Sequence, residues 1–329
     1  MSDDSDACAA DFAEHTRHLF VDVAQARAIA AGGRPALRAV FRKVHGVASG
    51  WLRLAEDRPD WTRHGIFAGN AYRCWTRFSS DIPPDAGDEE NGTLGLGIKL
   101  FGASSPSLAV VDPEAPTADL LFQNHDVFFV DTGADMCRFT DLSLKGRAEE
   151  WFEVHPETKQ ILADMAKHED SVLTATYSST LPYACGAATA VKYRLVPQQA
   201  GPSRAEPGDK DRLRTDLRLR LGEGPAAFAF ELQRPEPGFM PDLDCATQHW
   251  PEADAPFVSI GTLVLDQQDV TAEGQGAYGE NLAFSPWRVP EANRPLGSIA
   301  ESRRAAYPSS AAQRHKVNGI PEAEPHRPR

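Results

Sequence analysis

The sequence has few cysteines, no long apolar run and no excess of positive charge. Its five cysteines among 329 residues are odd in number and never form a C-x-x-C pair. We therefore expect neither a disulfide framework nor a zinc site, and a reducing compartment fits better. No run approaches the roughly 18 apolar residues of a membrane span. The 47 acidic side chains outnumber the 34 basic ones, for a formal charge of −13, which argues against nucleic acid and anionic membranes as partners.

The composition is that of an ordinary soluble globular protein, with 41% apolar and 25% charged residues. The opening segment MSDDSDACAADF is acidic and lacks the basic and apolar regions of a signal peptide. These features predict a cytoplasmic protein with a large core.

Hydrophobic periodicity predicts an α+β fold in one domain. An alanine-rich helix occupies much of residues 1–35 and ends before Gly32 and Gly33. Short alternating runs over 36–200 predict strands with helices inserted at 133–170. The part 201–315 adds further strands, including LRTDLRLRLGEG, then an irregular wrapping segment and a last helix around Ser298 to Ala306, before a flexible tail at 316–329. The economical arrangement is an antiparallel β-barrel with flanking helices.

Arg303 and Tyr307 stand four residues apart in the last predicted helix, so their side chains share a face. A tyrosine binds ferric iron as its phenolate, and an adjacent guanidinium favours that anion. Such a pair suits a tyrosinate-bound haem, although most pairs at this spacing belong to a solvated helix face.

The surrounding segment resembles the proximal region of haem catalases. That family carries Trp-Pro, a glycine-containing strand, Phe with a nearby proline, R-x-x-x-Y-P, and a downstream Arg-His. The same order is found here as Trp250-Pro251, Gly261 to Leu265, Phe284 with Pro286, Arg303 to Tyr307, and Arg314-His315. The resemblance implies a catalase-type β-barrel around a buried b-type haem whose iron is held by Tyr307.

Three N-terminal segments are similar to the distal side of the same family. FRKVHGVASGWLRL resembles the R-V-V-H strand, which implies His45 as acid–base, Val44 over the iron and Arg42 on a propionate. AYRCWTRFSS resembles the R-F-S strand and implies Arg77 on a propionate and Ser79 bonded to His45. DLLFQNHDVFFV resembles N-x-P-x-F-F, placing Asn124 beside His45 and Phe129 in the pocket wall. The remaining binding residues implied are Phe284, Arg303 and Arg314, with Arg314 on a propionate.

The resemblance implies an oxidoreductase that processes peroxides, with His45 and Asn124 catalytic and a small peroxide as the partner molecule. Hydrogen peroxide, organic hydroperoxides, and fatty-acid hydroperoxide rearrangement of the allene-oxide-synthase kind all stay open, as does a homodimer. Val44 favours the peroxide-cleaving branch. Departures occur at Gly92 to Leu100, which lacks the family's usual Asp and Arg, and at Asn124-His125-Asp126. A non-catalytic haem-binding protein and a barrel without cofactor are the rival interpretations.

Overall fold

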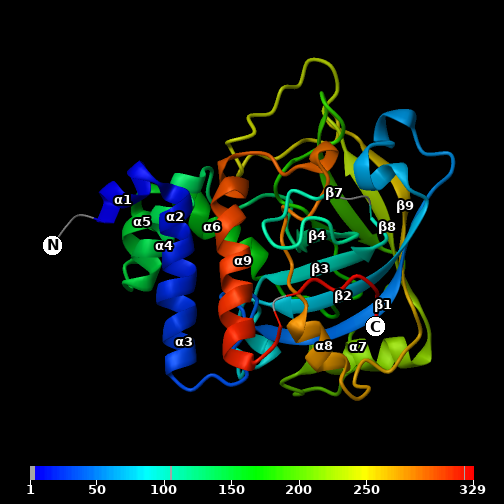
Figure 1. The fold of residues 1–329 in the computed structure, drawn as a ribbon, viewed down its shortest axis with the longest axis horizontal. Coiled ribbons are helices and arrows are strands. Elements are labelled where there is room, and N and C mark those ends of the chain that lie inside the picture. The colour runs from blue at the N-terminus through cyan, green and yellow to red at the C-terminus, as the bar shows by residue number, and fades with distance from the viewer. Residues whose placement is uncertain (1–3, 104–105, 322) are drawn as a thin grey trace.

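A closed antiparallel β-barrel forms the centre of the computed structural model, which describes residues 4–103, 106–321 and 323–329 (Figure 1). The strands are β1 (Lys43–Leu54), β2 (Ala71–Ser80), β3 (Leu94–Phe101), β4 (Thr117–Gln123), β5 (Tyr177–Ser178), β6 (Tyr183–Ala184), β7 (Ala190–Pro197), β8 (Ala226–Gln233) and β9 (Phe257–Leu265). β1 pairs with β2 and β9, and β5 pairs with β4 and β7, so eight strands close into a ring while β6 adds to β7. The predicted barrel with flanking helices is confirmed.

The barrel interior is filled by aromatic and branched side chains from the strands and from the 3₁₀ turn at Gly65–Ala68. Phe67, Tyr193 and Phe230 contact one another with ring centroids 5.5–5.9 Å apart. Gly50 of β1 lies against β9, where an added Cβ would meet the backbone of Val264 at 2.2 Å. The barrel is therefore a packed core, and a ligand has to bind outside it.

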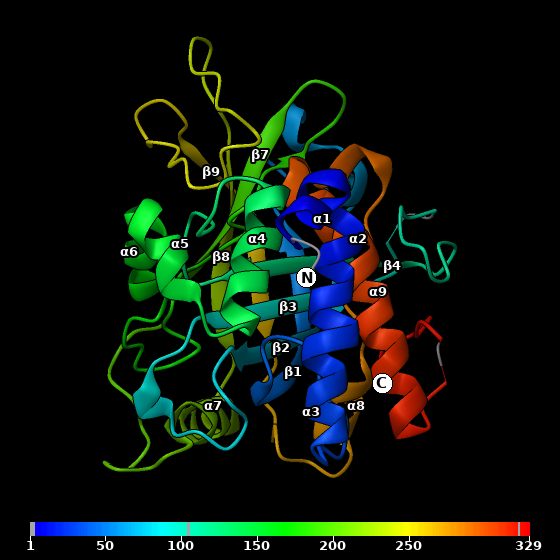
Figure 2. The same ribbon diagram turned by 90° about the vertical axis from the view of Figure 1, so that its left-hand side faces the viewer.

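Most helices lie in a layer on one side of the barrel (Figures 1 and 2). They are α1 (Asp4–Ala10), α2 (Phe12–Arg17), α3 (Ala26–Ala30), α4 (Gly133–Leu144), α5 (Ala148–Val154), α6 (Pro156–Met165) and α9 (Ser298–Asn318), while α7 (Arg212–Glu223) and α8 (Gln275–Asn281) lie below the barrel in Figure 1. A π-helix over His18–Gln25 joins α2 to α3, and 3₁₀ turns occupy Asp60–Thr62, Gly65–Ala68, Asp88–Glu90 and Glu291–Asn293. In the described part of the chain, no helix is both long and apolar enough to cross a membrane.

Polar contacts fix helix α4 against α9. Thr132 caps α4 through a reciprocal pair of hydrogen bonds with Asp135, which gives the helix a defined start. The backbone N–H of Gly133 then donates to Ser298 Oγ at 3.0 Å, so the first turns of α4 and α9 are joined. Both helices also pack on α2.

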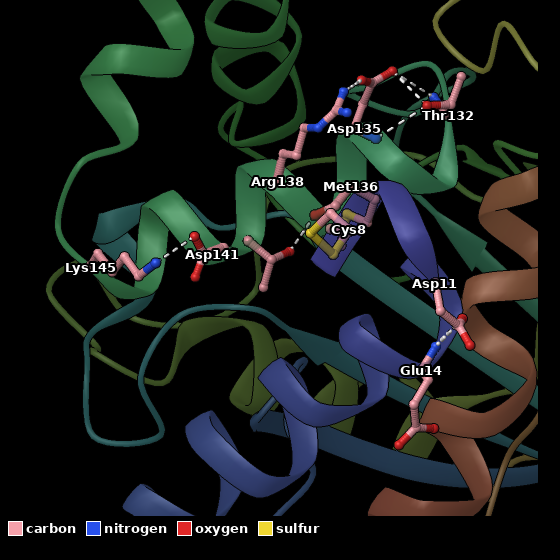
Figure 3. The surroundings of a disulfide bond; sticks show 11 residues. Cys8, Asp11, Glu14, Thr132, Asp135, Met136, Arg138, Asp141 and Lys145 are labelled. Carbon is pink, nitrogen blue, oxygen red and sulfur yellow. Dashed lines mark hydrogen bonds and ion pairs between the residues drawn. A yellow bond between two sulfur atoms is a disulfide. The ribbon is translucent and has the colours of Figure 1, made fainter. Parts of the chain in front are cut away.

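A disulfide bond joins Cys8 of α1 to Cys137 of α4 (Figure 3). This corrects the expectation that the sequence supports no disulfide framework. The two residues are 129 positions apart, and sequence spacing gave no sign that the helix layer would bring them together. Cysteine usage therefore no longer supports a reducing compartment.

The segment LRTDLRLRLGEG is helix α7 and not the predicted strand. Leu213, Leu217 and Leu221 are buried, four residues apart. Leucine and arginine alternate over part of this segment, which suggested a strand, but a buried leucine at every fourth residue and the packing on β1 are typical of a helix.

The C-terminal segment is more ordered than the sequence predicts. Helix α9 extends to Asn318, and Glu324 is buried beyond it in an ion pair with Lys99. Lys99 also contacts Asp119 at 2.6 Å, and Arg288 lies 3.5 Å from Glu324. Burial and the charge of Glu324 raise the pKa of Asp119 to about 6, although Lys99 opposes that shift. The tail therefore folds back onto the sheet.

Candidate functional site

A cavity of about 540 Å³ lies between the barrel and the helix layer. One wall is formed by strands β2, β3 and β4, and the opposite side comes from α9, α4 and the π-helix. The residues from the helices are largely small or apolar and include Phe20, Ala24, Met136, Phe139, Leu162, Met165, Ala306 and Ala311. Its volume is in the range typical of small-molecule and cofactor sites.

Helix α9 presents one face to the cavity. Arg303, Ala306, Tyr307, Ser310 and Arg314 all line it, at the three- and four-residue spacing that places side chains on one side of a helix. The Arg303 guanidinium also lies over the Phe128 ring, 5.0 Å from its centroid. The expected placement of Arg303 and Tyr307 on one face thus agrees with the structure.

The sheet wall consists of alternate residues from three neighbouring strands. Strand pairing places Arg77, Gly97 and Leu121 in one row, and Ser79, Gly95 and Gln123 in the next. All six line the cavity. Gly95 and Gly97 carry no side chain, which makes room for aromatic rings; an added Cβ at Gly97 would come within 3.3 Å of the Phe284 ring.

Three arginines gather around one carboxylate at one end of the cavity. Glu280 of α8 lies 2.6 Å from Arg38, 3.4 Å from Arg77 and 3.7 Å from Arg314. All three arginines line the cavity. Burial alone would raise the pKa of Glu280, but the three guanidinium charges outweigh it and lower that pKa. Three positive charges against one negative charge leave an excess of two.

In the described structure, the one carboxylate of Glu280 does not balance the positive charge of the three arginines. Burial, followed by the charge of Arg38, lowers the pKa of Arg77 to about 9 and that of Arg314 to about 8, although Glu280 opposes both shifts. Within the described structure, the Nε atoms of Arg77 and Arg314 are buried without a hydrogen-bond partner. Buried guanidinium groups in this condition favour an anionic ligand. The cluster fits a dianion.

Arg38 takes the place in this cluster that the resemblance to catalases implied for Arg42. Arg42 does not line the cavity, and neither does Val44. Arg38-Ala39-Val40-Phe41 has the same spacing as the R-V-V-H pattern, four residues before the match that we had used. This stretch departs from the family pattern at its last position, where Phe41 stands in place of histidine.

His45 lies outside the cavity. Its Nε2 atom is 3.1 Å from Ser80 Oγ, and its Nδ1 atom is 3.9 Å from Asp88 Oδ1. The strand pairing changes register between Val44 and Gly46, so His45 is the extra residue of a β-bulge and is turned away from the expected direction. Burial, and then the charge of Lys43, lower its pKa to about 3, so the imidazole is neutral.

Phe41 occupies the sheet wall in place of the expected histidine. Its backbone has a φ of +54°, an uncommon conformation for a bulky residue and one associated with functional sites. An added Cβ at Gly95 would lie 2.5 Å from the Phe41 ring, so the ring fills the space that glycine leaves. The carbonyl of Phe41 accepts a hydrogen bond from Arg77 at 3.0 Å.

Asn124 is also turned away, and its neighbour Gln123 lines the cavity instead. Asn124 accepts a hydrogen bond from the backbone N–H of Leu94 and donates one to the carbonyl of Met165. Successive strand residues face opposite sides, so an error of one residue exchanges the two faces. Ser79 does line the cavity, but it donates to the Gly95 carbonyl and not to His45.

The other expected binding residues, Phe129 and Phe284, both line the cavity. Sequence reasoning missed Arg38, Phe41, Asp81, Gln123 and Glu280. The alternation of Arg77, Ser79 and Asp81 along one strand could have indicated Asp81. The contribution of Glu280 depends on how α8 packs, and no local pattern shows that.

Comparison with known proteins finds no matching family model. One curated relative, the "Catalase-related peroxidase" of Mycolicibacterium paratuberculosis, is 26% identical over 273 residues, which cover 78% of this chain and 82% of the relative.

Solved catalases share the fold. A fungal catalase superposes with a TM-score of 0.67 at 18% identity, and covers 91% of this chain and 65% of its own. A bacterial catalase superposes with a TM-score of 0.66 at 18% identity, and the match covers 87% of this chain and 59% of the bacterial one. Catalase A from Saccharomyces cerevisiae superposes with a TM-score of 0.67 at 16% identity, and the match covers 90% of this chain and 67% of the yeast one. The chain thus spans about two thirds of the length of these catalases, or less.

Proposed function

Because the chain shares the fold of solved catalases and is similar to a catalase-related peroxidase, we propose that it is a catalase-like protein that binds a b-type haem in this cavity and uses it to process peroxides. The observation that carries the proposal is the arginine cluster of Arg38, Arg77 and Arg314. Its two surplus charges match the two propionates of haem, and guanidinium groups pair well with carboxylates. The relative named a catalase-related peroxidase supports the reaction class.

The remaining residues fit a flat, apolar cofactor. Tyr307 supplies the one phenolic oxygen among the described lining residues and would hold the iron, with Arg303 on the same helix face. Phe129 and Phe284 add apolar contacts, and the rings of Phe41 and Phe284 cover Gly95 and Gly97 on the sheet wall. When bound, haem supplies redox-active iron. The apolar side chains from the helices exclude bulk water, and Gln123 offers a hydrogen-bonding amide on the sheet wall.

A second candidate function is a haem carrier without catalysis. It is favoured by one observation: among the described residues that line the cavity there is no histidine. General acid–base groups at neutral pH are most often histidine, so a site without one could bind haem and leave peroxide untouched.

The test is to load the purified protein with haemin and to record the Soret absorbance of the parent and of Tyr307→Phe. We expect the parent to retain haem through gel filtration and the variant to lose it or to bind it weakly. Tyr183→Phe is the matched control, because it removes a phenolic oxygen at a buried position outside the cavity lining. Equal retention in all three proteins would contradict the assignment of Tyr307. A loaded parent that hydrogen peroxide and organic hydroperoxides leave unchanged would favour the carrier.

A further inference from the structure

Asp81 is the one carboxylate among the described residues that line the cavity. The other charged side chains there are the arginines Arg38, Arg77, Arg303 and Arg314. Besides Tyr307, which is assigned to the iron, Asp81 is therefore the described lining side chain of a type that commonly serves as a general acid or base.

Asp81 continues the sheet wall described above. Arg77, Ser79 and Asp81 are alternate residues and all line the cavity. The backbone N–H of Asp81 donates to the carbonyl of Thr93 at 3.2 Å, which places this pair one row beyond Ser79, Gly95 and Gln123. The carboxylate thus neighbours the row that holds Gln123.

Thr93 and Gly92 border the carboxylate. The hydroxyl group and the backbone N–H of Thr93 both act to lower the pKa of Asp81, as donors facing the ionised form do. Gly92 leaves room for the carboxylate, because an added Cβ there would lie 2.6 Å from Asp81 Oδ1.

The surroundings favour the protonated form more than water does. Asp81 is an exposed residue by surface area, but many protein atoms lie around its carboxyl group, and this partial desolvation raises the pKa of Asp81 although Thr93 opposes the shift. No cation pairs with it in the part of the chain that the structure describes. The charges on adjacent elements pair elsewhere: Arg77 with Glu280, Asp88 with Lys43, and Lys167 with Glu169.

We propose that Asp81 is the acid–base group of this cavity and takes the role that a histidine was expected to fill. The inference rests on the proposed haem function. The Asp81 carboxylate accepts the O–H proton of a hydroperoxide. It then returns that proton to the departing oxygen as the O–O bond breaks, so that water or an alcohol leaves. Bound haem would accept the second oxygen atom and would supply the two electrons that cleavage of the O–O bond requires.

The experiment compares haem-loaded parent, Asp81→Asn, Asp81→Glu and the exposed control Asp85→Asn. Stopped-flow absorbance measures the Soret change with hydrogen peroxide and the binding of hydrogen cyanide, which gives up its proton as it binds. Positioned acid–base groups contribute about 10²–10⁴-fold, so Asp81→Asn should slow both processes on that scale. Asp81→Glu should recover part of the rate, and Asp85→Asn should leave it unchanged. The parent rate should also change with pH as a carboxyl group with a raised pKa loses its proton. This pH dependence should be absent in Asp81→Asn.

A second readout needs no haem. Because the folded pKa is raised, ionised Asp81 destabilises the folded state at pH values above it, and this penalty disappears as pH falls through the ordinary range of the carboxyl group. Asp81→Asn should therefore raise the unfolding temperature of the apoprotein at pH 7 and not at pH 3.5. Loaded parent and Asp81→Asn with equal rates and equal pH profiles would overturn the assignment of Asp81 alone. A parent that does not retain haem would overturn the proposed function as well.

Discussion

Single residues decide the charge of the cavity. Arg38, Arg77 and Arg314 share one carboxylate, Glu280, and two of their Nε atoms are buried without partners in the described structure. If the propionates of haem supply the missing negative charge, then the affinity for haem depends on the charge of those propionates and on these three arginines.

Haem dimethyl ester provides a direct test, because it has the same ring but no propionate charge. The parent should bind it much more weakly than haem, and Arg38→Leu should lower haem affinity and reduce the difference between the two ligands. Arg42→Leu is the matched control, since Arg42 lies outside the cavity lining. Titrations followed by Soret absorbance give both affinities. If Arg42→Leu had the larger effect, the anion site would be misplaced.

The sequence predicted only part of this site, for reasons that lie in backbone geometry. Arg303 and Tyr307 were found because helical spacing fixes which residues share a face, and Arg314 because the resemblance to catalases implies an Arg-His pair downstream. His45 and Asn124 were misplaced because a β-bulge and an error of one residue each reverse the face to which a side chain points. A sequence pattern does not show a bulge, so residue type alone favoured the histidine over Phe41.

At the scale of elements, the sequence predicts the main strands and helix α9 correctly but predicts a strand where the structure has helix α7. Strand β2 alternates polar and apolar side chains, and α9 repeats its cavity residues at helical spacing. Helix α7 carries alternating leucine and arginine, which fits either element. The helix packs closely on β1, where Leu217 Cδ2 lies only 2.7 Å from a Cβ built on Gly46. This packing explains why the segment forms a helix and not a strand.

Alanine substitutions along α7 separate the two interpretations. Leu217→Ala should lower the free energy of unfolding by about 2–5 kcal/mol, because Leu217 is fully buried. Leu219→Ala should cost less, since Leu219 is only partly buried on the helix, whereas a strand would place both leucines on one face. Arg218→Ala, at an exposed position, should change little. Chemical denaturation measures all three. Equal losses at 217 and 219 would contradict the helix.

At the scale of the whole molecule, a disulfide bond joins two helices of the helix layer. The Cys8–Cys137 bond ties α1 to α4, and α4 and the π-helix both contribute residues to the cavity. A bond that closes a loop of this length restricts the unfolded chain strongly. It should therefore stabilise the fold and also keep this side of the cavity closed.

The double variant Cys8→Ser with Cys137→Ser should lose about 2–4 kcal/mol in the free energy of unfolding, the usual contribution of a native disulfide. It should also release haem faster, because α1 is no longer attached to α4, which lines the cavity. Cys245→Ser is the control, since Cys245 is outside the disulfide. Thiol titration in denaturant checks the premise: of five cysteines, three are free in the structure, so three should react before reduction and five after it. Five reactive thiols before reduction, together with equal stability of parent and double variant, would show that the bond does not form in solution. The closed side of the cavity would then depend on packing alone, on the contacts of α2 with α4 and α9.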